Sequence, residues 1–173
     1  FFGKFSQETE FAYQRVFSTG IDNKGILITF NLNYQLSDYI LTAGLDYVSG
    51  EVGTIESFNT LYATNHQYYG YMDYFLNLPI DTGGLGLQDI HVKLSGLNIA
   101  GVGVKGAYHS FSSVQPDVEG NSDFGSEIDI TLIKKYNDIV KFVAGYSIFI
   151  PGALKESEGA NGSFAYLMTI VNF

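Results

Sequence analysis

The 173-residue sequence has no cysteine, no tryptophan and only 3 prolines. Without cysteine it has neither disulfides nor a cysteine nucleophile, which fits a protein exposed to the periplasm, where stray disulfides form. No apolar run reaches the roughly 18 residues that a transmembrane helix needs, so a membrane protein built from helices is excluded. Basic residues are few, and a net charge of −9 argues against nucleic acid as a partner. The sequence shows neither an initiator methionine nor a signal peptide, so we expect a mature chain or a fragment.

Aromatic residues and glycine are abundant instead, with 13 Tyr, 14 Phe and 20 Gly, a composition that favours strands over helices. Apolar and polar residues alternate with period two, most clearly where Ile28 and Phe30 lie on one face and Asn31 on the other. This pattern predicts eight strands of about ten residues, the length at which a tilted strand crosses a bilayer. Their expected ranges are 4–17, 26–36, 39–49, 87–96, 99–111, 126–136, 139–150 and 163–173.

The connections between these strands alternate in length. Tight two-residue turns are expected at Ser37-Asp38, Leu97-Asn98 and Asn137-Asp138. The other connections are longer and polar, and they cover residues 18–25, 50–86, 112–125 and 151–162. Bacterial outer-membrane barrels have short periplasmic turns and longer outer loops, so the alternation predicts a barrel with both chain ends on the periplasmic side.

The sequence ends on an apolar, β-prone segment whose last residue is Phe173. An aromatic ring is stable at a bilayer interface, and the last strand of an outer-membrane barrel must pair with the first. We therefore expect Phe173 to be the assembly signal that the barrel assembly machinery recognises. Together these observations predict an all-β fold, an antiparallel transmembrane β-barrel of the outer-membrane type. It would form one domain over residues 1–173, integral to the Gram-negative outer membrane.

The width of this barrel is open to two interpretations. In a closed eight-stranded barrel the interior is just wide enough for side chains to fill it. Several inward positions are expected to be small, among them Gly44, Ser95 and Gly145, and the 50–86 loop would also need space. A wider barrel, in which this chain supplies eight of the strands and the loop folds into the lumen, suits both facts better. The closed eight-stranded barrel is the alternative.

Within that loop, the segment Phe58-Asn-Thr-Leu-Tyr-Ala-Thr-Asn-His-Gln-Tyr-Tyr-Gly-Tyr-Met-Asp-Tyr-Phe75 resembles a loop found late in porins of the alginate-export family. Residues 165–171 also resemble that family's closing strand, and the resemblance covers about residues 26–173. It implies a barrel of about 18 strands, with this chain as its C-terminal part, and a channel for passive passage of small hydrophilic solutes, anions included. Arg15 is the only arginine here, whereas the alginate exporter has an Arg-rich conduit, so the resemblance does not imply the solute.

Cationic side chains are expected to recur on the lumen faces of adjacent strands. A ladder of cations inside a pore favours anionic solutes. Its predicted members are His91, Lys93, Lys105, His109, Lys135 and Lys141. The alternative is that Asp46, Glu127 and Asp129 neutralise them, which would leave an ordinary solvated wall.

The loop supplies a second set of candidate residues, which we expect to constrict the pore. They are Asn65, His66, Tyr68, Tyr69, Tyr71, Asp73 and Tyr74. Hydrogen bonds from Asn65, His66 and Asp73 are expected to tie the loop to the barrel wall. Direct contact between the tyrosines and a solute is the alternative role, because aromatic rings offer sugars a stacking surface.

No catalytic residue, cofactor or metal site is predicted, and the chain is not expected to be an enzyme. His66 and Asp73 lack a serine or cysteine nucleophile at a recognisable spacing, and the acid-rich segment 115–127 departs from the spacing of a calcium loop. Expected partners are outer-membrane lipid and lipopolysaccharide, the barrel assembly machinery and a small hydrophilic solute. The alternative function is a non-conducting β-barrel that acts as an anchor or scaffold with other envelope proteins.

Overall fold

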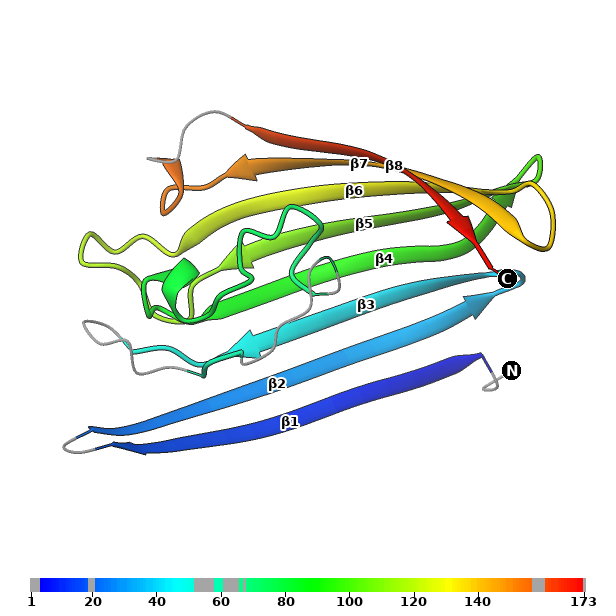
Figure 1. Ribbon diagram of the computed structural model, residues 1–173. Helices are drawn as coiled ribbons and strands as arrows, with labels where there is room; N and C mark the ends of the chain where they lie inside the picture. The colour runs from blue at the N-terminus through cyan, green and yellow to red at the C-terminus, as the bar shows by residue number, and fades with distance from the viewer. Residues whose placement is uncertain are drawn as a thin grey trace.

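The computed structural model describes residues 4–18, 21–51, 58–60, 66, 68–156 and 161–172. Eight strands form one antiparallel sheet, in which each strand is hydrogen-bonded to its neighbours along the chain. The strands are β1 (Phe5–Ser18), β2 (Ile21–Leu36), β3 (Tyr39–Val48), β4 (Leu87–Ile99), β5 (Val102–Ser112), β6 (Asp123–Lys135), β7 (Val140–Pro151) and β8 (Gly162–Val171). The predicted all-β class and the eight antiparallel strands are thus confirmed (Figure 1).

The sheet curves around the connection between β3 and β4 but is not closed, because β1 and β8 remain its two edges. One stretch of this connection reaches both edges. The backbone N–H of Asn59 donates to Gln14 Oε1 of β1 at 2.9 Å, and Tyr71 stacks on Tyr166 of β8. The turns β2–β3, β4–β5 and β6–β7 lie at the same end of the sheet as both chain ends, and the β3–β4, β5–β6 and β7–β8 connections lie at the other end (Figure 1).

The two faces of the sheet have the opposite character to those of a soluble β-sandwich. The convex face carries exposed apolar side chains on successive strands, and they include Ile28, Phe30, Leu41, Leu45, Ile90, Val92, Tyr108, Ile128, Ile130, Phe142 and Tyr146. The concave face buries polar and charged side chains, namely Asp46, Asp89, His91, His109, Glu127, Asp129, Thr131 and Ser147. Successive residues of a strand point to opposite faces, so the alternation of the sequence determines this separation.

The connection between β1 and β2 differs from the long polar loop that the composition of residues 18–25 predicts. Ser18 is paired with Ile21, and the pairing continues through Lys24, which lies opposite Arg15. The prediction is wrong because hydrogen bonding between two backbones needs no apolar side chains. This part of the β1–β2 pair projects beyond the rest of the sheet (Figure 1), and short and long connections therefore do not alternate strictly.

The turn between β4 and β5 lies at Ala100 and Gly101, so the prediction of a turn at Leu97-Asn98 is wrong. Both turn residues have a positive φ, of 50° and 77°, as a two-residue type I′ hairpin requires. The difference arises from a β-bulge, because the register of β4 against β5 shifts between Leu94 and Leu97. Gly96, with a φ of 81°, lies in this bulge and accommodates the extra residue.

The apolar core lies between the β3–β4 connection and the concave face of the sheet. Its buried members are Val48, Tyr69, Phe75, Leu78, Leu87, Phe111, Phe124 and Phe149. Phe75 is central, with ring centroids 4.7 Å from Phe111 and 5.3 Å from Phe124. The same connection contains a short 3-10 helix, η1 (Ile80–Thr82). Within the described residues, no helix is both long and apolar enough to cross a membrane.

Candidate functional site

The β3–β4 connection packs onto the concave face over residues 58–60, 66 and 68–76, which we call the inner loop. One polar anchor is Glu127 of β6, whose side chain is fully buried. Its Oε1 accepts hydrogen bonds from the backbone N–H groups of Tyr71 at 2.5 Å and of Met72 at 2.8 Å. Two backbone donors thus share one side-chain oxygen of β6, and this contact holds the middle of the loop to the sheet.

Gly70 allows this contact, and alanine in its place is predicted to disturb it. Gly70 has a φ of +84°, and a Cβ there would lie 2.5 Å from the carboxylate carbon of Glu127. Gly70→Ala is expected to lower the free energy of unfolding by about 2–4 kcal/mol, because backbone strain alone costs about 1–2 kcal/mol. Gly120→Ala is the matched control, since Gly120 has a φ of +88° and nothing within 4 Å of the added Cβ. If urea unfolding shows that both variants lose the same free energy of unfolding, the Glu127 contact does not fix the loop.

His66 and Asp73 close the inner loop on itself. The backbone N–H of His66 donates to Asp73 Oδ1 at 2.9 Å, and His66 Nδ1 lies 2.9 Å from the carbonyl oxygen of Tyr71. The predicted hydrogen bonds from this pair to the wall are therefore wrong among the described residues, because their polar groups are used within the loop. His66 meets the wall through its ring, which stacks on Phe164 of β8. Asn65, the third predicted member, lies outside the described residues.

The four tyrosines predicted to line a constriction lie in different surroundings. Tyr68 is 48% exposed and lines a cavity, whereas Tyr69 is buried in the apolar core. Burial raises the pKa of Tyr69 above its ordinary value, so its phenol stays neutral. Tyr74 stacks on Phe149 with ring centroids 4.0 Å apart, and Tyr71 stacks on an aromatic ring of β8. Tyr68 is thus more exposed than Tyr69, but Tyr69 also lines the first cavity, and Tyr71 lines a second one.

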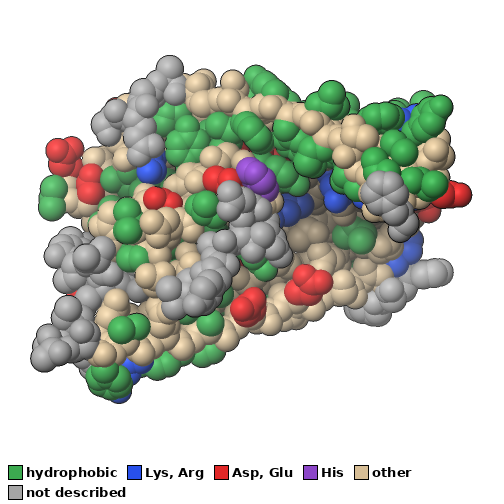
Figure 2. Space-filling model, viewed as in Figure 1, with side chains coloured by type: hydrophobic (Ala, Val, Ile, Leu, Met, Phe, Trp, Pro, Cys, Tyr) green, Lys and Arg blue, Asp and Glu red, His purple; other side chains and the backbone are tan. Residues whose placement is uncertain are grey.

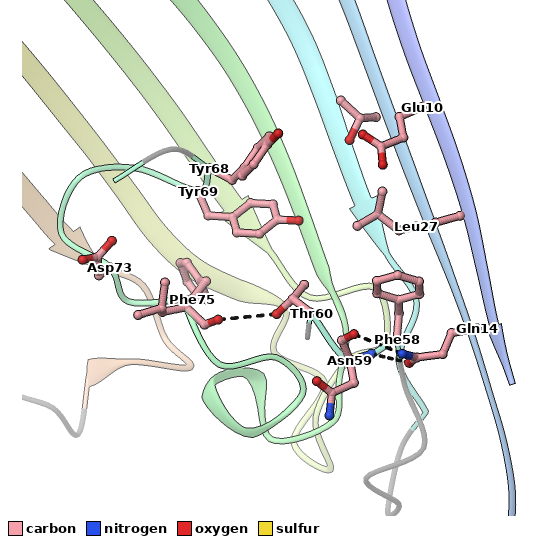
Figure 3. A pocket seen from close by; sticks show the side chains of 13 residues that line it. Glu10, Gln14, Leu27, Phe58, Asn59, Thr60, Tyr68, Tyr69, Asp73 and Phe75 are labelled. Atoms are coloured by element: carbon pink, nitrogen blue, oxygen red, sulfur yellow. Dashed lines mark hydrogen bonds between the residues drawn. The ribbon is translucent and has the colours of Figure 1, made fainter. Parts of the chain in front are cut away.

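A cavity of about 320 Å³ separates the inner loop from β1 and β2 (Figure 3). Glu10 lines it from the side of β1, and Tyr68 and Thr60 line it from the side of the loop. Gln14 closes one part of its rim, because its Nε2 donates to the carbonyl oxygen of Asn59 at 3.3 Å and its Oε1 accepts from the Asn59 N–H. Two acids, Glu10 and Asp73, together with amides, hydroxyl groups and aromatic rings form a lining that suits a small polar solute.

A second cavity, of about 240 Å³, is lined by three of the predicted cationic residues, namely Lys93, Lys105 and His109. Lys93 of β4 and Lys105 of β5 line it together with Thr131 and part of the inner loop. Figure 2 shows Lys or Arg side chains in a hollow of this face beside the loop. Lys135 and Lys141 instead lie opposite each other on β6 and β7, where these strands approach their turn. Lys105 and Lys135 also line one shared cavity, of about 290 Å³, so the two pairs of lysines adjoin each other.

The two histidines of the predicted ladder, His91 and His109, are buried among acids. They lie directly opposite each other on β4 and β5. His109 Nδ1 is 2.7 Å from Asp89 Oδ2, and His91 Nδ1 is 3.4 Å from the same oxygen. Asp46 approaches to 4.0 Å from His91 Nδ1, and Asp129 approaches to 3.9 Å from His109 Nε2. We call these five buried residues the acid–histidine cluster; two of them, His109 and Asp129, also line the cavity that contains Lys93 and Lys105.

Glycines on the concave face are covered by rings from neighbouring strands. A Cβ would lie 2.2 Å from His91 Nε2 at Gly44, and 2.2 Å from the Tyr166 ring at Gly145. His91 crosses Gly44 to reach Asn31 Oδ1 of β2, at 2.9 Å from its Nε2. The expectation that small inward residues leave unfilled space is wrong at these two positions, because each glycine gives room to a larger ring.

Asp89 is the candidate residue that the sequence analysis missed. It lies two positions before His91 in β4, so the two side chains point to the same face. This spacing could have predicted from the sequence that Asp89 lies close to His91. Ser147 of β7 also contacts this cluster, because its Oγ donates to Asp129 Oδ1 at 2.5 Å. Phe173, the predicted assembly signal, lies outside the described residues.

Comparison of the chain with protein-family models, with curated proteins and with solved structures finds no match. The two cavities flank a loop that is held by polar and apolar contacts. They offer different chemistry, since Glu10 lies in the first, whereas Lys93 and Lys105 lie in the second.

Proposed function

We propose that this chain is part of an outer-membrane β-barrel channel for the passive passage of small hydrophilic solutes, anions among them. In keeping with its resemblance to alginate-export porins, it would form the C-terminal strands of a barrel of about 18. The observation that carries the proposal is the character of the two faces: apolar side chains are exposed on the convex face, and charged ones are buried on the concave face.

The convex face is suited to hydrocarbon because it is apolar on consecutive strands. Ile90 is 52% exposed, Ile130 49% and Tyr146 48%. Soluble monomers rarely expose a contiguous apolar surface of this extent. In a bilayer the same side chains would contact lipid tails, while the paired strands satisfy each other's backbone groups, as hydrocarbon requires.

The open edges of the sheet support a barrel wider than eight strands. In the described sheet β1 and β8 each have a strand partner on one side only, and hydrocarbon does not tolerate unpaired backbone N–H and C=O groups. The inner loop occupies the space between these edges, where it contacts Gln14 of β1 and Tyr166 of β8. Further strands of the same protein would therefore close the wall around the loop.

Electrical recordings in planar bilayers test the proposal. The protein, expressed from its complete reading frame, is expected to give stepwise currents with an anion preference. The double variant Lys93→Gln/Lys105→Gln should move the reversal potential towards cation preference, because it removes the positive field beside the inner loop. Lys135→Gln/Lys141→Gln is the matched control: it removes the same charge near a turn, away from the loop, and is expected to have the smaller effect.

The alternative function, a non-conducting barrel that serves as an anchor or scaffold, is favoured by one observation, the apolar core between the inner loop and the concave face. A protein that inserts into the bilayer but carries no current would support this alternative. A protein that stays in solution without detergent and does not insert would contradict the membrane proposal itself. If both double lysine variants shift the reversal potential equally, the second cavity has no special role in the anion preference of the channel.

A further inference from the structure

Three ligand atoms of the acid–histidine cluster converge on one point. Asp89 Oδ2, His91 Nδ1 and one ring nitrogen of His109 lie within 4.8 Å of one another. Cross-strand pairing produces this arrangement, because His91 faces His109 directly and Asp89 lies on the same face of β4. The side chains are 0–2% exposed, so water does not compete for these atoms.

The hydrogen bonds of His91 leave one of its nitrogens unsatisfied. Its Nε2 lies 2.9 Å from Asn31 Oδ1, an acceptor, so Nε2 carries a proton. His91 Nδ1 has no hydrogen-bond partner and faces the Asp89 carboxylate at 3.4 Å. Either a proton on Nδ1 or a metal ion between the two groups makes this approach of His91 to the carboxylate favourable, and a metal ion would occupy the same place as the proton.

The acids of the cluster also have unpaired oxygens. Asp46 Oδ1, Asp89 Oδ1 and Asp129 Oδ2 are buried and have no hydrogen-bond partner. Burying carboxylates without compensation is costly, and buried charges are generally paired or coordinate a metal. A divalent cation would satisfy the lone pair of His91 and also offset this negative charge.

We propose that Asp89, His91 and His109 bind a divalent transition-metal ion, for which zinc is the probe of choice. Imidazole nitrogens with a carboxylate suit zinc and related metals, whereas calcium and magnesium prefer ligand sets made of oxygen. Around tetrahedral zinc, with bonds of about 2.1 Å, neighbouring ligand atoms are about 3.4 Å apart. His91 Nδ1 and Asp89 Oδ2 already have this separation, and the 2.7 Å contact of His109 Nδ1 would lengthen when the metal enters.

The neighbouring residues provide the outer contacts that such a site needs. Metal-bound histidines usually donate their second N–H to an oxygen. Asn31 Oδ1 holds this position for His91, and Asp129 Oδ2 lies 3.9 Å from His109 Nε2. The cavity that contains Lys93 and Lys105 is also lined by His109 and Asp129, and it offers a path for the ion. The bound metal would link β4 to β5 behind the inner loop, whether or not the barrel conducts.

Calorimetric titration with zinc chloride tests the site. The protein, expressed from its complete reading frame and purified in detergent, is first treated with a chelator. We expect about one high-affinity zinc ion per chain, with affinity reduced more than about 100-fold in His91→Gln and in His109→Gln, and reduced about 10- to 100-fold in Asp129→Asn. The matched control is His66→Gln, which changes the remaining histidine, outside the cluster, and should bind zinc like the unaltered protein.

X-ray absorption of the zinc-loaded, unaltered protein gives a second test that does not depend on the folding of any variant. Two imidazole ligands and oxygen in the first coordination shell are expected. The proposal is overturned if the unaltered protein binds no zinc, if His91→Gln and His109→Gln bind it with undiminished affinity, or if His66→Gln abolishes binding. It is also overturned if calcium or magnesium at equal concentration displaces the zinc.

Discussion

Replacing Phe75 by alanine is expected to release the inner loop from the concave face and to weaken their contact by about 3–5 kcal/mol. Phe75 is 1% exposed, and its ring packs against Phe111, Phe124 and Phe149. These three partners belong to three strands whose hydrogen bonds keep them in place, so the cavity left by the substitution cannot collapse. Native-state hydrogen exchange should show lost protection at the Tyr71 amide, which is bound to Glu127, while the strand amides stay protected.

Ile80→Ala is the control for this experiment. Ile80 lies in the same β3–β4 connection but is 66% exposed, so its truncation should change stability by no more than about 0.5 kcal/mol. Unchanged exchange at Tyr71 in Phe75→Ala would mean that the polar contacts with Glu127 hold the loop without help from the core. Loss of protection throughout the strands would show that the loop and the wall unfold as one unit.

The alternation of the sequence was sufficient to predict the strands and their faces. Ile28 and Phe30 lie on the exposed face and Asn31 on the opposite one, because the two-residue period is a property of the extended backbone. Composition was a weaker guide. The polar residues of segment 18–25 favoured a loop, but Ser18 and residues 21–25 pair as strand, because backbone hydrogen bonds between strands do not require apolar side chains.

The candidate site was less predictable, because it depends on the register between strands and on contacts between residues that are far apart in the sequence. The alternation places His91 and Lys93 on one face but does not say which of them meets a partner across the sheet. The pairing of His91 with His109 follows from the bulge near Gly96 and the turn at Ala100, which were not recognised. The contact between Glu127 and the inner loop joins residues more than fifty positions apart, and no local pattern signals it.

Removing the inner loop is expected to raise the conductance of the proposed channel severalfold. The change replaces residues 58–75 with a short Gly-Ser linker. The described residues of this segment extend over the concave face from Gln14 of β1 to Tyr166 of β8, and they are therefore expected to obstruct the pore. The wall should persist, because its backbone hydrogen bonds run between neighbouring strands and do not involve the loop. Single-channel recordings measure the conductance, and the heat-dependent mobility of the folded barrel in detergent gels shows whether the wall has formed.

A deletion in the β5–β6 connection provides the control, because that connection lies at the end of the sheet and its Val118 is 94% exposed. Replacing residues 115–121 by the same linker should leave the conductance close to that of the unaltered protein. If the inner-loop deletion folds but conducts no better than this control, the loop does not obstruct the pore. In that case the narrowest part of the channel would lie away from the cavity beside the loop, which Lys93, Lys105, His109 and Asp129 line.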